Sequence, residues 1–181
     1  AEVIYEKATG HFAEYESFME TDKNEPKPLY LIEPDTDESI NWIAERIIEI
    51  FKAYGGDIPS IAIFLSSEEE IFQFSNRLGS IDLLADYDIK IKACNGGQAL
   101  GDSNTVRVFS VDYIKGLEFE AVFFYNIDEL IRKSKGDLLL KSLYVGLSRA
   151  TFYLGITASQ DIERLSFLKE SLEMSELNWK I

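Results

Sequence analysis

Short apolar runs alternate with amphipathic segments from residue 28 onward, and this alternation limits the fold more than any other feature of the sequence. The run IAIFL at residues 61–65 is apolar throughout, as expected of a strand buried on both faces. Strands separated by helices predict a three-layer α/β fold with a mainly parallel sheet and right-handed crossovers. Strands are expected at 29–32, 61–65, 89–93, 105–111, 121–125 and 152–157, and helices at 40–54, 67–78, 138–150 and 161–174.

The sequence also predicts how the chain is divided. Residues 22–28 read DKNEPKP, which is typical of a loop, so residues 1–28 are interpreted as a leading segment or linker. Residues 29–181 are predicted to form a single domain. Ligands of parallel α/β sheets bind beyond the carboxyl ends of the strands, so a site is expected in the loops that follow those ends. The relevant strands end near Leu65, Val111, Tyr125 and Thr157.

Composition excludes several classes of protein. Apolar residues make up 46% of the chain, which excludes disorder for most of it. A single cysteine and a single histidine exclude a disulfide framework, a Cys/His zinc site and a histidine-based catalytic triad, so no metal site is expected. No apolar run approaches the roughly 18 residues that span a bilayer, and no signal segment opens the chain. We therefore expect a soluble, cytoplasmic protein that does not enter a membrane.

The net charge of −14 argues against a protein that binds phosphate backbones over a broad surface. Binding of a nucleic acid would have to come from a local surface or from another part of the protein. The acidic surface could alternatively face a basic protein partner.

The first segment with candidate chemistry is VFSVDYIKGLEFEAVFF, at residues 108–124. Roughly nine residues join two strands here, too few for an ordinary crossover helix, so a compact loop or short helical turn is predicted. Gly116 would permit a tight backbone, and Lys115 and Glu118 would be held at the sheet edge, where they could face a ligand. The alternative, which the residues alone leave equally open, is a tight turn whose Lys and Glu side chains are only solvated.

The second segment is KSLYVGLSRAT, at residues 141–151. Its helical spacing predicts one apolar stripe, with Arg149 roughly opposite that stripe. A guanidinium group in this position could bind a phosphate through two parallel hydrogen bonds. Alternatively, Arg149 complements the dipole at the carboxyl end of the helix, and helical geometry alone favours this reading. The stripe consists of Leu140, Leu143, Tyr144 and Leu147.

Together these segments resemble motifs V and VI of UvrD/Rep-type superfamily 1 DNA helicases. KGLEFEAV is similar to motif V and YVGLSRA to motif VI, with looser similarity over residues 28–160. The resemblance implies a C-terminal RecA-like (2A-type) domain with a P-loop NTPase-type fold. No G-x-x-x-x-G-K-[ST] phosphate loop occurs in the chain. The resemblance therefore implies that ATP and Mg²⁺ are bound mainly by a missing N-terminal RecA-like domain, and that the chain alone is inactive.

The resemblance also implies roles for single residues. Arg149 matches the motif VI arginine that reaches the γ-phosphate of ATP across the cleft between two RecA-like domains, and would be catalytic. Glu118 matches the motif V glutamate that contacts the ribose, while Gly116 and the neighbouring Lys115 would complete the nucleotide-binding loop. Ser110 matches the residue whose hydroxyl contacts the backbone of single-stranded DNA.

The chain departs from the family at two positions that would face DNA. Asp112 stands where family members commonly have histidine, and Ser66-Ser67 follow the strand at 61–65 where many members have a basic residue. These departures favour an alternative function, a non-catalytic helicase-like scaffold that binds a protein partner. The intact pair of Glu118 and Arg149 favours the motor domain of an ATP-dependent DNA helicase or translocase.

Two further sets of residues have less direct interpretations. Asp128 and Glu129 follow a strand and superficially resemble a Walker B pair, but their position after motif V indicates surface or loop acids. Three aromatic residues could stack on nucleic-acid bases, although aromatics at helical spacing more often belong to a core. They are Phe72, Phe74 and Tyr87.

Overall fold

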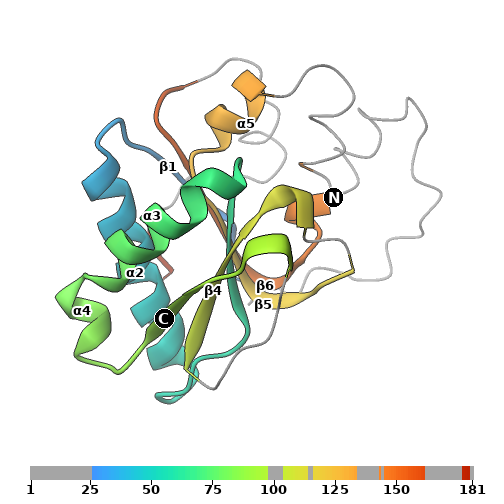
Figure 1. Cartoon of the computed structure of the whole chain (residues 1–181). Coiled ribbons are helices and arrows are strands. Elements are labelled where there is room, and N and C mark those ends of the chain that lie inside the picture. The colour runs from blue at the N-terminus through green and yellow to red at the C-terminus, as the bar shows by residue number, and fades with distance from the viewer. Residues whose placement is uncertain are drawn as a thin grey trace.

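A parallel sheet with helices on both faces forms the centre of the molecule (Figure 1). This computed structural model describes residues 26–97, 104–113, 116–133, 143, 145–161 and 177–179. The six strands have the order β1-β6-β5-β2-β4-β3, and every neighbouring pair is parallel. Their bounds are β1 Leu29–Ile32, β2 Ile61–Leu65, β3 Lys90–Ala93, β4 Thr105–Ser110, β5 Phe119–Phe124 and β6 Ala150–Ala158. The predicted three-layer α/β fold is confirmed.

Each face of the sheet is covered by its own apolar cluster. On one face, α2 (Thr36–Ala53), α3 (Glu68–Gly79) and α4 (Asp82–Ala85) pack on the sheet. On the other face, α5 (Ile127–Lys133) and the helical residues 145–147 do so. Every residue of the central strand β2 is buried, which explains why its sequence lacks the alternation of a half-exposed strand.

Side-chain caps fix where the two long helices begin. The carboxylate of Asp35 accepts hydrogen bonds from the backbone N–H groups of Asp37 (2.8 Å) and Glu38 (3.2 Å) at the start of α2. The hydroxyl of Ser67 accepts from the N–H of Glu69 (3.3 Å) at the start of α3. Glu70, in the first turn of α3, forms an ion pair with Lys133 of α5 (2.8 Å).

The Asp35 cap gives a first prediction about stability. Asp35→Ala should lower the free energy of unfolding by about 1 kcal/mol, because two N–H groups of α2 lose their acceptor. Urea denaturation followed by circular dichroism would measure the change. Asn41→Ala, at an exposed interior position of the same helix, is the control and should leave stability within about 0.5 kcal/mol or raise it. Equal losses in both variants would contradict the cap.

Two sequence predictions about the fold require correction. The helix predicted at 138–150 ends early, since residues 148–149 form a turn and Ala150 begins β6. The helix ends there because the carbonyl of Arg149 accepts a hydrogen bond from the N–H of Phe119 (2.9 Å), which begins the pairing of β6 with β5. The helix predicted at 161–174 lies outside the described residues, apart from its first residue, which is not helical.

Asp128 is the second correction, because it is fully buried rather than a surface acid. Its carboxylate accepts from Arg132 (2.8 Å) and from both the N–H (2.9 Å) and the hydroxyl (2.6 Å) of Ser159. Asp128 therefore ties α5 to the carboxyl end of β6. A buried carboxylate is tolerated here because the guanidinium group of Arg132 and the two donors of Ser159 all bond to it.

The aromatic residues divide as the core interpretation predicts, with one exception. Phe74 packs against Tyr125 with ring centroids 4.6 Å apart, and Tyr87 packs against Phe51 at 5.2 Å. Phe72 differs because it is 66% exposed on α3. The described helices include none with the length and apolar character to cross a bilayer.

Candidate functional site

Arg149, in the segment at residues 141–151, forms a hydrogen bond to the segment at residues 108–124. It lies in the turn between the helical residues 145–147 and β6, and it is half-buried. Its Nε donates to the carbonyl of Val145 (3.1 Å), and its Nη1 donates to the carbonyl of Leu117 (3.1 Å). The first contact satisfies a carbonyl at the helix end, as the alternative reading of this arginine expected. The second fixes the guanidinium group against the loop that contains Glu118.

Gly116 and Glu118 flank the carbonyl that Arg149 binds. Gly116 has a φ of +82°, a conformation that favours glycine, and a Cβ at this position would meet nothing within 4 Å. Glu118 is exposed. The loop therefore presents an open backbone and an exposed carboxylate beside an oriented guanidinium group. The remaining nucleotide-binding candidate, Lys115, lies outside the described residues.

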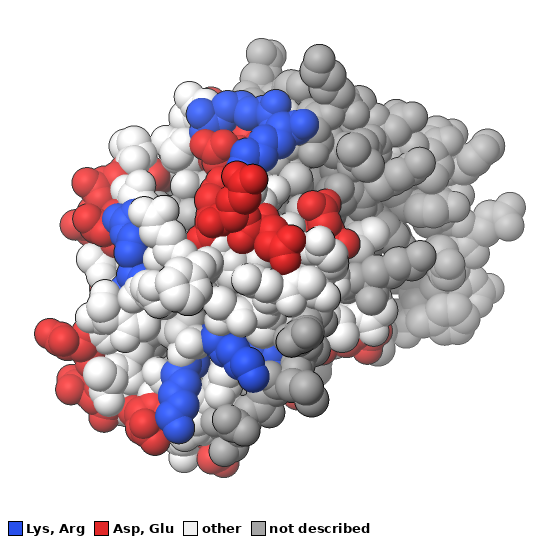
Figure 2. Space-filling model, in the orientation of Figure 1, with Lys and Arg blue, Asp and Glu red and all other residues white. Residues whose placement is uncertain are grey.

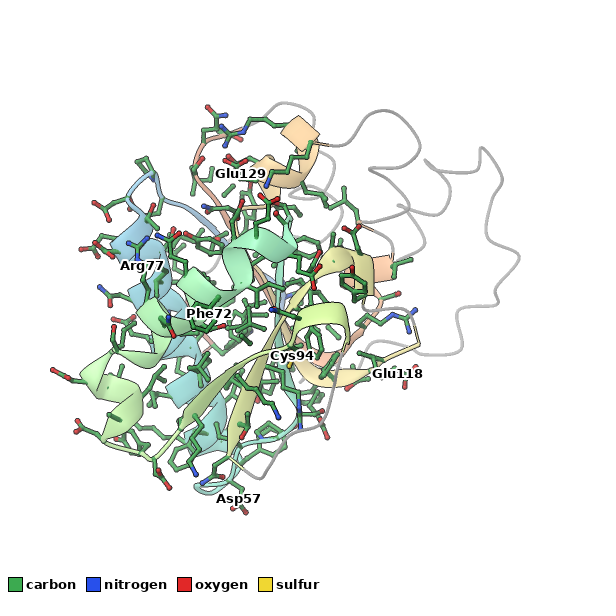
Figure 3. All side chains as sticks on the ribbon, viewed as in Figure 1. Asp57, Phe72, Arg77, Cys94, Glu118 and Glu129 are labelled. Carbon is green, nitrogen blue, oxygen red and sulfur yellow. The ribbon has the colours of Figure 1, made fainter. Side chains whose placement is uncertain are left out.

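These residues lie at the amino ends of their strands. Phe119, the first residue of β5, is the register partner of Ala150, the first residue of β6, and Glu118 and Arg149 directly precede them. The expectation that the site follows the carboxyl ends is therefore wrong for Gly116, Glu118 and Arg149. Figure 3 shows Glu118 well apart from Glu129, which lies beyond the carboxyl end of β5.

Ser110 and Asp112, the predicted nucleic-acid contacts, lie at the opposite edge. Ser110 ends β4 beside Leu65, the last residue of β2. The start of β5 lies roughly 20 Å from the level of Ser110 along the strand direction, at about 3.3 Å per residue. Residues 111–118 return the chain from one edge to the other, because β4 and β5 both run parallel to β2. One connection thus links the two halves of the predicted site.

The serine hydroxyl at this edge is turned inward. Ser110 is fully buried, and its Oγ accepts from the N–H of Asp112 (3.4 Å) and lies 3.5 Å from the Asp112 carboxylate. Asp112 is exposed. Nearby, Glu68 accepts from the hydroxyl of Tyr113 (3.2 Å) and from the N–H of Gly96 (2.7 Å). This hydrogen bond to Glu68 raises the pKa of Tyr113. Carboxylates therefore dominate this part of the edge.

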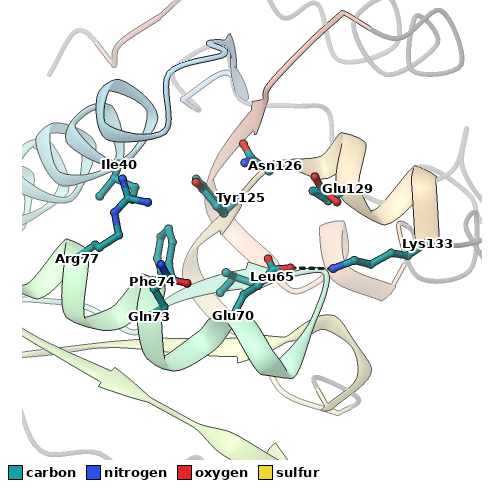
Figure 4. Close-up of a pocket in the computed structure, with 10 residues that line it drawn as sticks. All are labelled: Ile40, Leu65, Glu70, Gln73, Phe74, Arg77, Tyr125, Asn126, Glu129 and Lys133. Carbon is teal, nitrogen blue, oxygen red and sulfur yellow. Dashed lines mark hydrogen bonds and ion pairs between the residues drawn. The ribbon is translucent and has the colours of Figure 1, made fainter.

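A cavity of about 270 Å³ opens beyond the carboxyl ends of β2 and β5 (Figure 4). These adjacent strands lead into helices on opposite faces of the sheet, which is the arrangement where ligands of α/β proteins commonly bind. Two cations line the cavity, and both are neutralised. Lys133 binds Glu70 (2.8 Å) and the hydroxyl of Ser66 (3.1 Å), and Arg77 is paired with Asp37.

Gly146 positions the helical residues before Arg149, and sequence reasoning missed it. A Cβ at Gly146 would lie 2.3 Å from the Cε2 atom of Phe124, a fully buried ring of β5. Leu143 and Leu147 of the predicted apolar stripe are buried in the same cluster. The sequence carried a signal in the glycine of YVGLSRA, but only the packing reveals why a side chain does not fit.

Comparison with known proteins shows the fold. No family model and no curated protein matches the chain. It is similar to a solved structure described as the C-terminal domain of a possible DNA helicase from a Lactobacillus strain, WCFS1. The two share 18% identity over 76% of this chain and 77% of that chain, with a TM-score of 0.58. The chain therefore has the parallel α/β fold of that helicase C-terminal domain.

Proposed function

We propose that this chain is the C-terminal motor domain of an ATP-dependent DNA helicase or translocase of the UvrD/Rep type. The observation that carries the proposal is the guanidinium group of Arg149, held between the carbonyls of Val145 and Leu117 and beside Glu118. The fold shared with a helicase C-terminal domain supports it. The decisive test is DNA-stimulated ATP hydrolysis that depends on Arg149.

ATP and its Mg²⁺ would be bound mainly by an N-terminal RecA-like domain that carries the phosphate loop. The 181 residues of this chain contain no G-x-x-x-x-G-K-[ST]. Among the described residues, no group of three His, Cys, Asp or Glu side chains could hold a metal ion. This chain would complete the nucleotide site from the other side of the cleft, by adding charge and hydrogen-bonding groups.

Arg149 would stabilise the charge that develops on the transferred phosphoryl group. Two of its nitrogens are engaged by carbonyl groups, and within the described part of the chain nothing bonds Nη2. A guanidinium group oriented before the reaction needs little reorganisation, which is where electrostatic catalysis gains most. The same group would sense whether the γ-phosphate is present.

The connection at residues 111–118 would couple ATP to DNA. Its first residues follow Ser110 at the carboxyl edge, and its last residue, Glu118, precedes β5 at the amino edge. Movement of this connection on ATP hydrolysis would therefore shift residues at both the carboxyl edge and the amino edge of the sheet. Single-stranded DNA is the expected track.

Glu118 should affect the binding of ATP more than its hydrolysis. In the protein that joins this chain to a phosphate-loop domain, Glu118→Gln should raise KM for ATP about tenfold with little change in kcat, because an exposed carboxylate that accepts from the ribose would be lost. Steady-state ATPase assays measure both constants. Glu69→Gln, at an exposed position of α3, is the control. An unchanged KM would remove Glu118 from the nucleotide site.

A second candidate function is a scaffold without catalysis. The carboxylates of Glu68 and the exposed Asp112 beside the buried Ser110 favour it, since they oppose a phosphate backbone. Such a domain would offer an acidic surface to a basic protein partner. A protein joined to a phosphate-loop domain that shows no DNA-stimulated ATPase activity would favour the scaffold over the motor.

A further inference from the structure

Three basic residues gather at the β3–β4 end of the sheet. Lys90 and Lys92 alternate along the edge strand β3 and so project from one face, and Lys92 is the register partner of Arg107 on β4. Ile91, between the two lysines, packs on the other face, where it meets Gly79 of α3. The three cations therefore share the face of the sheet opposite α3. We call this set the β3–β4 strip.

Four cations elsewhere in the described part of the chain are neutralised by carboxylates. Among these same described residues, Lys90 and Arg107 form no ion pair. In a chain with a net charge of −14, these two cations are therefore positive charges that no carboxylate of the described residues neutralises, and Lys92 lies on the same face beside them. The neutralised pairs are Arg46–Glu49, Arg77–Asp37, Arg132–Asp128 and Lys133–Glu70.

The strip is accessible and has an unused donor. Lys90 and Lys92 are exposed, and Arg107 is half-buried with its Nε buried and unbonded among the described residues. Burial raises the pKa of the neighbouring Cys94 thiol, while Lys92 and Arg107 act in the opposite direction, as two close positive charges should. Figure 2 shows Lys and Arg side chains grouped in the lower centre of the view, where β3 and β4 lie in Figure 1.

We propose that the β3–β4 strip of Lys90, Lys92 and Arg107 binds the phosphate backbone of a single-stranded nucleic acid. This inference rests on the proposed motor function and names a surface through which this domain would contact its track. Lys90 and Lys92 stand about 7 Å apart along β3, and Arg107 lies about 5 Å across the sheet from Lys92, by strand geometry. A chain of regularly spaced anions fits such a row. At the carboxyl edge, by contrast, Ser110 is buried.

The salt dependence of binding tests the strip. Fluorescence anisotropy would follow a labelled thymidine oligonucleotide of about 20 nucleotides, enough to cover a site of this size, as it binds the 181-residue chain. Each phosphate contact contributes about 0.7 to the slope of log K against log salt. Lys90→Ala/Lys92→Ala/Arg107→Gln should lower that slope by about 2 and weaken binding at low salt at least tenfold. Lys52→Ala, an exposed lysine of α2, is the control and should change neither.

Several outcomes would overturn the inference. One is a wild-type chain that does not bind the oligonucleotide at low salt, and another is a triple variant with unchanged slope. A poly-glutamate peptide that competes as well as the oligonucleotide would assign the surface to an acidic protein instead. Unchanged DNA binding with new aggregation would mean that Lys90 and Lys92 only protect the edge of β3.

Two precautions keep the result interpretable. Lys90→Glu/Lys92→Glu changes only exposed side chains, so it should keep the wild-type melting temperature while it abolishes binding. The motor function is judged separately, by the dependence of ATPase activity on Arg149. Failure of the strip with an intact Arg149 effect would place the DNA contact elsewhere, whereas loss of the Arg149 effect would remove the motor itself.

Discussion

Arg149→Ala should lower kcat for DNA-stimulated ATP hydrolysis about a thousandfold, in the protein that joins this chain to a phosphate-loop domain. An arginine that stabilises the transferring phosphoryl group acts mainly in the transition state, so kcat should fall far more than the affinity for ATP. Binding of single-stranded DNA should change less than threefold, because Arg149 lies at the amino edge of β6, away from the β3–β4 strip.

The measurement needs variants that separate charge from geometry. Arg149→Lys keeps the charge but loses the planar fork, and a lysine could not bind the carbonyls of Val145 and Leu117 while reaching a phosphate. It should therefore recover less than a tenth of the lost kcat. Arg77→Ala is the matched control, since its ion pair with Asp37 is partly exposed and lies at the opposite edge. A kcat within threefold of wild type for Arg149→Ala would end its catalytic assignment.

The strands were predictable because burial on both faces leaves a plain signal in sequence. Residues 61–65 form β2 with the predicted bounds, and residues 29–32 form β1. Boundaries set by distant partners were not predictable. The helix predicted to reach Ala150 ends early because the Arg149 carbonyl bonds Phe119, a residue far away in sequence. The hydrophobic periodicity of a segment does not depend on such a contact and therefore cannot predict it.

The candidate site was predictable in its residue types but not in its geometry. The resemblance selected Glu118 and Arg149, and the structure brings their backbones to one edge. The carbonyls of Leu117 and Val145, which orient the guanidinium group, leave no trace in a sequence because every residue has a carbonyl. Asp128 was misread as a surface acid for a related reason, since its partner Ser159 follows a different strand.

Gly146→Ala should lower the free energy of unfolding by about 2 kcal/mol. The new Cβ would lie 2.3 Å from the ring of Phe124, which is 1% exposed and has no room to withdraw. Overpacking of this kind costs about 3 kcal/mol, and the better helix propensity of alanine offsets about 1 kcal/mol. The melting temperature should fall by about 4–8 °C, as calorimetry would measure.

The same change should also impair the site. The carbonyl of Gly146 accepts from the N–H of Arg149 (3.2 Å), so pushing this turn away from β5 moves the guanidinium group with it. Phe124→Leu makes room for the new methyl group, and the double variant should therefore lose less stability than the sum of the two single changes. Gly79→Ala, whose Cβ would lie an ordinary 3.7 Å from Ile91, should cost nothing measurable. Additive losses in the double variant would mean that Phe124 does not set the requirement for glycine at this position.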